Sequence, residues 1–388
     1  MARGARDLAD ESRTRERIKT TARDADSYRV ASSARAGTIE ASVAGGPLKT
    51  LMSAAAPSVT IVIPVLNERP WISDCLQSLR RQDTPIREIL VVDGGSTDGT
   101  RDLVAAVGAN DARVRLLENP GRSAAAAMNV GLAGAAGEFL VRADAHALYA
   151  PDFVRRSVEV LAETGAADVG GPMRPVGTTR FGRAVAAVTS TRFGMGSGAF
   201  HWTTKRRVVD TVYLGCYRTT TLRDLGGYDE TDLQWAAEDQ ELNFRLRQRA
   251  ATIVCDPSVR SWYFPRDSPR ALWRQYRNYG LCKVSTLVKH HTLPTLRPLA
   301  PPALVAVLVV SGSAAAWTRK PLLATPIAAW VAVVAALSAR LGRQPGVDPA
   351  RASLALAICH VSYGIGFWVG LGRVMVGRRF ETRPRGRR

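Results

Sequence analysis

The sequence has few cysteines, and none of them lies in a recognisable motif. The five cysteines among the 388 residues are scattered, without a CxxC pair or a zinc-finger spacing. An odd and dispersed set argues against a disulfide framework and indicates reduced thiols in a cytosolic compartment. The chain also lacks the basic and aromatic strand pattern of RNA-binding modules, so its charge does not predict a nucleic-acid partner.

The N-terminal part has little large apolar content. It begins with MARGARDLADESRTRERIKT, which is rich in arginine but also acidic, and no apolar run follows it. This pattern is not that of a secretory signal. Because residues 1–50 hold too few apolar side chains to form a core, we expect a disordered tail there.

Positive charge is abundant and unevenly placed. The formal net charge is +19, and much of the excess flanks apolar stretches near the C-terminus and lies in the final residues, GRRFETRPRGRR. Basic residues beside apolar segments are typical of proteins that bind an anionic membrane surface. The charge pattern therefore favours a membrane partner.

Strand and helix patterns alternate after residue 57. Runs of β-branched and apolar residues predict buried strands at 58–63, 88–93, 114–118 and 138–144. Helical spacing between these runs predicts a parallel sheet with helices on both faces, which binds ligands at the carboxyl ends of its strands. Four polar or turn-forming residues fall at such ends: Pro64, Glu68, Asp93 and Asp144.

The middle of the chain is less regular. The glycine-rich stretch 193–200 lacks the strand–turn–helix context of a dinucleotide fingerprint, so we expect a mobile loop there. A strand-like run at 208–218 and an acidic helix start at 236–248 follow.

The C-terminal third is largely apolar. Ser268 and Pro269 begin a helical pattern that predicts an amphipathic helix at a membrane interface over 266–298. Apolar stretches follow at 299–317, 322–338 and 353–372, each close to the roughly 20 residues that span a bilayer. We expect a membrane segment of two to three helices over 299–372 and a basic tail over 373–388; a buried helical domain is the alternative.

The orientation of these stretches is constrained by charge. Three full spans would place the basic C-terminus outside if the preceding domain lies inside, against the positive-inside bias. We therefore expect one stretch to be re-entrant or interfacial.

Asp144 and His146 stand two residues apart after the fourth predicted strand, in RADAHA. At a strand end, side chains at i and i+2 can turn toward one point. A carboxylate and an imidazole there suit Mn²⁺ or Mg²⁺ bound together with phosphates and waters. The alternative is a capped loop with a surface histidine.

Several motifs occur in one order along the chain: VTIVIPVLNE, ILVVDGGSTDGT, MNVGLAGAAGEFLVRADAHA, VYLGCYR and AAEDQELNFRLR. Together they resemble the family 2 inverting glycosyltransferases, whose GT-A fold is a Rossmann-like domain that binds nucleotide sugars. RADAHALY, GGPM, VDTVYLGCYR and GGYDE resemble the ExoA-like succinoglycan biosynthesis branch. The resemblance covers about residues 57–285 and predicts a GT-A domain over 51–265.

The resemblance implies a set of residues at the nucleotide. Pro64, Leu66 and Glu68 would contact it, and Asp93 would bind the uracil edge. Arg122 and Asn129 match positions beside the nucleotide.

The resemblance also implies the reacting groups. Asp144 and His146 stand where the family has Asp-x-Asp and would hold Mg²⁺ or Mn²⁺. Glu238 and Asp239 match the Glu-Asp motif, in which Asp239 is the catalytic base. RQYRNYG (274–280) resembles the Gln/Arg-x-x-Arg-Trp motif but lacks its tryptophan. Arg274 and Arg277 in this motif would either hold a diphosphate or form a basic face that anchors the helix at a membrane.

The implied function is a membrane-attached, inverting sugar transfer. A UDP-sugar would be the donor and a polyprenyl-diphosphate-linked saccharide the acceptor, at the cytoplasmic side of the inner (plasma) membrane, in exopolysaccharide or cell-envelope glycan synthesis. One alternative is a polyprenyl-phosphate hexose synthase, in which the acceptor is the phosphate itself. The other is a non-catalytic membrane scaffold that binds nucleotide sugars.

Overall fold

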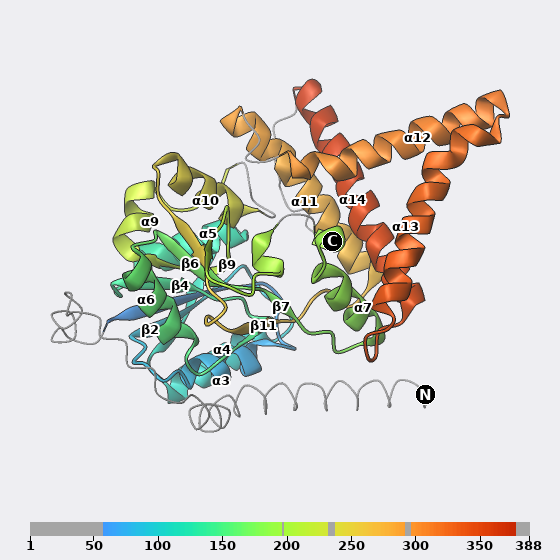
Figure 1. Ribbon diagram of the computed structural model, residues 1–388. Helices are drawn as coiled ribbons and strands as arrows, with labels where there is room; N and C mark the ends of the chain where they lie inside the picture. Colours follow the sequence, from blue (N-terminus) through green and yellow to red (C-terminus); the bar gives the residue numbers. More distant parts are fainter. Residues whose placement is uncertain (1–56, 196–197, 232–236, 292–295, 378–388) are drawn as a thin grey trace, which may run out of the picture.

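An eight-stranded sheet forms the centre of the molecule in the computed structural model, which describes residues 57–195, 198–231, 237–291 and 296–377 (Figure 1). The strand order is β3-β2-β1-β4-β9-β6-β10-β8. The strands are β1 (Val59–Val65), β2 (Glu88–Asp93), β3 (Val114–Glu118), β4 (Phe139–Arg142), β6 (Asp168–Gly171), β8 (Arg207–Val208), β9 (Tyr213–Arg218) and β10 (Ile253–Cys255). The predicted tail over residues 1–50 lies outside the described residues.

The first half of the sheet is parallel, as predicted. β1 pairs with β2 on one side and with β4 on the other, and β2 pairs with β3, all in parallel register. β9 then runs antiparallel to both β4 and β6. The carboxyl ends of β1, β2 and β4 therefore meet at one edge of the sheet.

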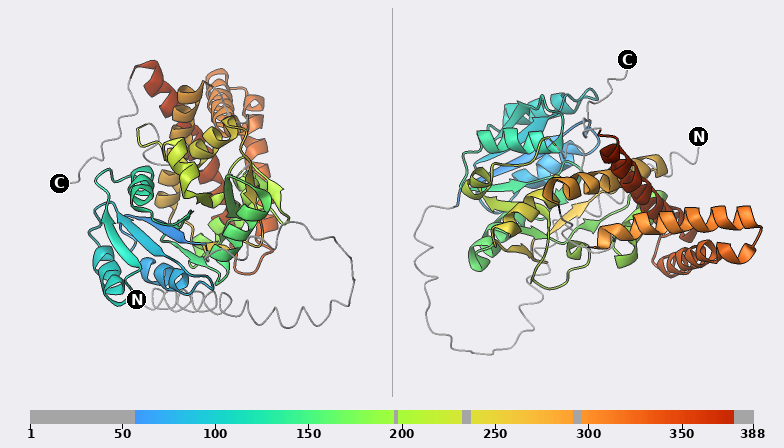
Figure 2. Two further views of the ribbon diagram at one scale, coloured as in Figure 1. Left: turned by 90° about the vertical axis from the view of Figure 1, so that its left-hand side faces the viewer. Right: turned by 90° about the horizontal axis from the view of Figure 1, so that it is seen from above.

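Helices cover both faces of this sheet (Figures 1 and 2). One apolar core lies under α3 (Ile72–Arg80), α4 (Thr100–Asn110) and α6 (Phe153–Thr164). The opposite core lies under α5 (Ala124–Gly134), α9 (Thr219–Leu225) and α10 (Glu238–Gln248). Because strand side chains alternate, Ile61 and Ile63 enter the first core while Val62 enters the second.

A small three-stranded sheet lies beside the main one. Its order is β5-β11-β7, formed by β5 (Ala147–Tyr149), β11 (Ser261–Tyr263) and β7 (Arg174–Pro175). β5 begins at Ala147, the last residue of the RADAHA motif, so this sheet fixes the chain after β4.

The glycine-rich stretch 193–200 is partly helical, which corrects the expected loop. Residues on both sides of 196–197 form α8 (Arg192–Met195) and the 3₁₀ turn η3 (Ala199–His201). Gly198, before η3, has an extended backbone, and residues 196–197 lie outside the described part of the chain.

The C-terminal helices form a separate layer. α11 (Pro269–His290) begins with Ser268 as its cap and proline at its start, as predicted. It packs along α14 (Pro349–Met375), which also contacts α7 (Arg180–Thr189), and side chains of all three helices share one apolar core. The buried side of α11, including Leu272 and Tyr276, thus lies against protein, while its placement at a membrane surface stays a prediction.

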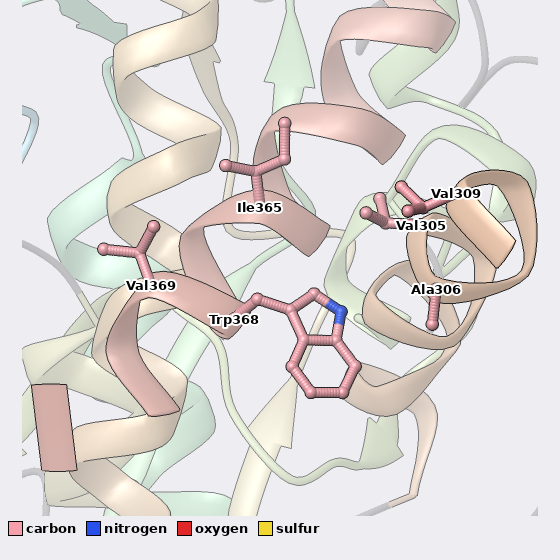
Figure 3. Close-up of a pocket in the computed structure, with 6 residues that line it drawn as sticks. All are labelled: Val305, Ala306, Val309, Ile365, Trp368 and Val369. Carbon is pink, nitrogen blue, oxygen red and sulfur yellow. The ribbon is translucent and has the colours of Figure 1, made fainter. Parts of the chain in front are cut away.

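Two further helices project from this layer. After the 3₁₀ turn η4 (Arg297–Leu299), helix α12 (Ala300–Thr318) runs away from the rest of the molecule (Figures 1 and 2). The chain turns at η5 (Pro321–Ala324) and runs back along α13 (Thr325–Leu341). α12, α13 and α14 are each long and apolar enough to cross a membrane. An apolar groove separates α12 from α14, where the Trp368 Nε1–H donates to the Pro302 carbonyl at 2.9 Å (Figure 3).

Candidate active site

Arg142 gathers three carboxylates at the carboxyl edge of the sheet. Its Nη1 lies 2.9 Å from Glu238 Oε1 and also donates to Asp239 Oδ1, while its Nε lies 3.4 Å from Asp144 Oδ1. The arginine is buried, with 7% of its surface exposed. The structure thus brings the predicted Asp144 together with the predicted Glu238 and Asp239.

Strand alternation explains this convergence. Leu140 belongs to the core under α10, and Arg142, two residues later on β4, has its side chain on the same face. Glu238 and Asp239 occupy the first turn of α10, after Ala237 in the left-handed region (φ 68°). Carboxylates at a helix start are favoured as anions.

Burial acts against that preference at Asp239. It raises the pKa of the Asp239 carboxyl to about 7 in spite of the Arg142 charge, and the carboxylates of Glu238 and Asp144 act in the same direction as burial. A carboxyl that titrates near neutral pH and keeps 25% of its side-chain surface exposed has the properties of a general base.

Glu68 binds His146 across the strand ends. Its Oε1 lies 3.2 Å from His146 Nδ1, and its backbone carbonyl accepts hydrogen bonds from the first turn of α3. Because a carboxylate can only accept, the neutral imidazole would donate from Nδ1 and keep its lone pair on Nε2. Glu68, expected at the nucleotide, thus supports the imidazole.

These groups fit a divalent cation. An imidazole whose Nδ1–H is held by a carboxylate is the usual supported form of a histidine ligand, and Asp144 adds a carboxylate oxygen. Within the described ranges no group of three or more acidic, histidine or cysteine side chains gathers as a metal cage. A site with two protein ligands suits Mg²⁺ or Mn²⁺, which keep positions for phosphate oxygens and waters.

Asp93 and Arg122 form the neighbouring part of the edge. The Asp93 carboxylate accepts from the backbone N–H groups of Gly95 and Ser96 at 3.0–3.2 Å and pairs with Arg101 at 2.9 Å. Although burial opposes them, the hydrogen bonds from Ser96 and Arg101 hold the pKa of Asp93 below its ordinary value. The Arg122 guanidinium lies beside Gly95, about 3.8 Å from where a Cβ would stand.

Other predicted residues lie apart from this cluster. The Asn129 amide binds the backbone of Tyr228 at 2.7 and 2.9 Å and Glu230 at 2.6 Å, so it fastens α5 to that turn. Pro64 lies within β1, and Leu66 after it is 41% exposed. Of the arginines on α11, Arg274 is exposed and Arg277 is half-buried.

α11 lies across the site. The Gln275 amide donates to the hydroxyls of Tyr263 and Tyr279 at 3.3 and 3.0 Å, and the Tyr263 ring packs edge-on against His146. Farther along, Lys283 donates to Gln240 Oε1, next to Asp239. The helix that joins the sheet domain to the apolar helices thus also touches both ends of the site.

Sequence reasoning missed Arg142 and Lys283. A signal for Arg142 was present, because an arginine two residues before Asp144 in a buried run must point to the same side of the strand. Lys283 carries no comparable signal, since its partner is set by how α11 crosses α10.

Comparisons with known proteins identify the family of the chain. The family described as Glycosyl transferase family 2 matches residues 60–215. The chain is 31% identical over 316 residues, 80% of this chain and 94% of the relative, to the succinoglycan biosynthesis protein ExoA of Rhizobium meliloti (strain 1021).

Two more distant proteins complete the comparison. One is dolichyl N-acetyl-alpha-D-glucosaminyl phosphate 3-beta-D-2,3-diacetamido-2,3-dideoxy-beta-D-glucuronosyltransferase of Methanococcus voltae, 28% identical over 58% of this chain and 72% of the relative. The other is the structure of a Pyrobaculum calidifontis mannosyltransferase in complex with GDP-Man and Mn²⁺, 22% identical over 85% of this chain and 89% of that chain, with a TM-score of 0.49. From the family match and the relationship to ExoA, which spans nearly the whole relative, the chain belongs to glycosyl transferase family 2, with the mixed α/β sheet of the GT-A fold.

Proposed function

We propose that this protein is a membrane-attached inverting glycosyltransferase. It transfers one sugar from a UDP-sugar to a hydroxyl group of a polyprenyl-diphosphate-linked saccharide, at the cytoplasmic face of the inner membrane. The observation that carries the proposal is the shared guanidinium of Arg142, which holds a candidate metal ligand, Asp144, beside a candidate base, Asp239.

The chemistry follows from these neighbours. In an inverting transfer, the acceptor oxygen attacks the anomeric carbon as the bond from that carbon to the diphosphate breaks, and a base takes the hydroxyl proton. We propose that Asp239, whose pKa burial raises to about 7, accepts that proton. Asp144 and His146 would hold Mg²⁺ or Mn²⁺, which stabilises the negative charge of the departing diphosphate.

The donor is proposed to lie along the strand ends. Its diphosphate would sit near Asp144, and its nucleoside near Asp93 and Arg122, which form the adjacent edge over β2 and β3. From the nucleoside side, the Arg122 guanidinium would reach toward the diphosphate and supply charge-assisted hydrogen bonds to its oxygens.

The acceptor is proposed to be lipid-linked for two reasons. Three helices are long and apolar enough to cross a membrane, which supports attachment there, and α11 connects them to the site. The Methanococcus voltae relative acts, by its name, on a dolichyl-linked glucosaminyl phosphate. An acceptor hydroxyl on a membrane-bound saccharide would thus reach Asp239 from the α11 side.

The test is a donor and acceptor screen with full-length protein in native-like membranes, read by mass. We expect a sugar–lipid product and UDP. Asp239→Asn should lower kcat by about 10²–10⁴-fold while the affinity for the donor barely changes. Asp102→Asn, at an exposed position of α4, is the matched control.

Three outcomes would contradict the proposal. Transfer to polyprenyl phosphate that survives Asp239→Asn would indicate a hexose synthase, because a phosphate acceptor needs no base. Donor binding without turnover would indicate a scaffold. Equal loss of binding and rate in Asp239→Asn would make Asp239 structural.

A further inference from the structure

We propose that Arg142 is a positioning residue for the transfer: it fixes the carboxylate of Asp239 at a set place relative to Asp144. This inference rests on the proposed function and assigns a task to a residue outside the predicted site. Arg142 acts through Asp239 and touches neither sugar.

The first argument is electrostatic. Asp144, Glu238 and Asp239 surround one buried guanidinium, so the cluster carries three negative charges against one positive charge when all are ionised. Like charges that meet around one guanidinium repel each other more strongly in a buried site than they would in water. Without Arg142, repulsion would drive the Asp239 side chain away from Asp144.

The second argument is geometric. Nη1 of Arg142 pairs with Glu238 and Asp239 on α10, while Nε of Arg142 pairs with Asp144, which follows β4. The planar guanidinium sets these directions, and a lysine ammonium, which is a compact point charge, cannot reproduce them.

The third argument is mechanical. Arg142 is held in register by the sheet, since it pairs with Val62 of β1 and is followed by a 2.9 Å bond from the Ala143 N–H to the Val62 carbonyl. α10 starts differently: among the described residues, no side chain caps its first turn. The ion pairs to Arg142 therefore tie the start of α10, and with it Asp239, to the rigid strand.

The experiment is a double-mutant cycle in full-length protein. Arg142→Gln should lower kcat by roughly 10²-fold and change the donor KM by less than about threefold. Arg142→Lys should recover part of the lost kcat because it restores the positive charge. In an Asp239→Asn background, Arg142→Gln should lower kcat by less than about a further threefold, because its effect passes through Asp239. Arg218→Gln, which breaks the exposed pair with Glu138, is the control and should leave kcat unchanged.

The outcomes separate this inference from the proposed function. If the unmodified protein transfers no sugar from any UDP-sugar, the proposed function fails. If it does, and Arg142→Gln costs as much in the Asp239→Asn background as alone, or mainly raises the donor KM, the positioning role is overturned. Should Arg142→Gln fail to fold, the same cycle with Arg142→Lys decides, and additive losses there also overturn the inference.

Discussion

Glu68 orients the His146 imidazole at the site. Because its carboxylate holds the Nδ1 proton at 3.2 Å, the imidazole offers Nε2, and its ring is further fixed by Tyr263. A histidine in place of the second carboxylate of Asp-x-Asp also lowers the negative charge at the metal. If His146 binds a metal, its strength as a ligand would therefore depend on a residue 78 positions earlier in the chain.

Glu68→Gln should weaken metal binding without removing a ligand. The amide keeps a hydrogen-bond acceptor but loses the charge that raises imidazole basicity, which typically costs about 10–100-fold in metal affinity. We expect the Mn²⁺ or Mg²⁺ concentration for half-maximal transfer to rise by that factor. Glu138→Gln, at an exposed ion pair, is the control, and equal behaviour of the two variants would contradict the support role.

The raised pKa of Asp239 predicts an acid limb in the rate. A base must be deprotonated to act, and burial raises the pKa of this carboxyl to about 7, so kcat/KM should fall as pH drops through neutrality. The measurement is kcat/KM for the donor from about pH 5.5 to about pH 8.5 with saturating metal. A limb that persists unchanged in the residual activity of Asp239→Asn would assign it to another group.

At the scale of elements, two glycines set how closely α11 and α14 pack. A Cβ at Gly280 would stand 2.0 Å from the carbonyl oxygen of Tyr363, and a Cβ at Gly366 would stand 2.0 Å from that of Arg277. Backbone atoms cannot yield to such an approach, so both positions require glycine. This packing holds α11 over the site.

Gly366→Ala should therefore separate the two helices. We expect a loss of about 1–3 kcal/mol in stability, as for other overpacked sites, and a lower transfer rate because Gln275 and Lys283 shift. Gly372→Ala on the same helix is the matched control, since its Cβ would meet no described atom within 4 Å. Thermal unfolding in detergent should show a lower midpoint for Gly366→Ala alone; equal midpoints would contradict the packing argument.

The elements differ in how far pattern alone could predict them. β2 and β3 have the predicted bounds. β2 is buried along its whole length, as its continuous apolar run predicts. β3 is the edge strand and is buried only at Val114, so its predicted burial is wrong. The ion pair of Arg142 with Asp239 joins residues 97 positions apart, and Asn129 binds a turn 99 positions away. Such contacts depend on how α10 and α5 dock on the sheet, which hydrophobic periodicity does not encode. The motifs therefore supplied candidate reacting groups but not the residues that support them.

For the whole molecule, the apolar helices divide into two kinds. In the most apolar windows of α12 and α13 only 6% and 11% of residues are buried, whereas half of the α14 window is buried, largely against α11 and α7. At about 1.5 Å per residue, the 19 residues of α12 and the 17 of α13 come close to the roughly 30 Å of a bilayer core. α12 and α13 thus resemble a membrane-inserted hairpin, with α14 held at the domain surface.

A hairpin of this kind predicts that residue 375 lies on the same side as the sheet domain. Both ends of a two-helix insertion face one side, which keeps the basic C-terminal segment inside and satisfies the positive-inside bias that three spans would violate. Arg319, at the tip of the hairpin, and Met375, at the end of α14, are both exposed and can be replaced by cysteine as Arg319→Cys and Met375→Cys. The five native cysteines are buried, so they should not react with the reagent. In intact cells, a membrane-impermeant thiol reagent should label Arg319→Cys and spare Met375→Cys, while permeabilised cells should label both. Labelling of Met375→Cys in intact cells would show instead that α14 crosses the membrane, and the contacts of α14 with α7 would then have to break on insertion.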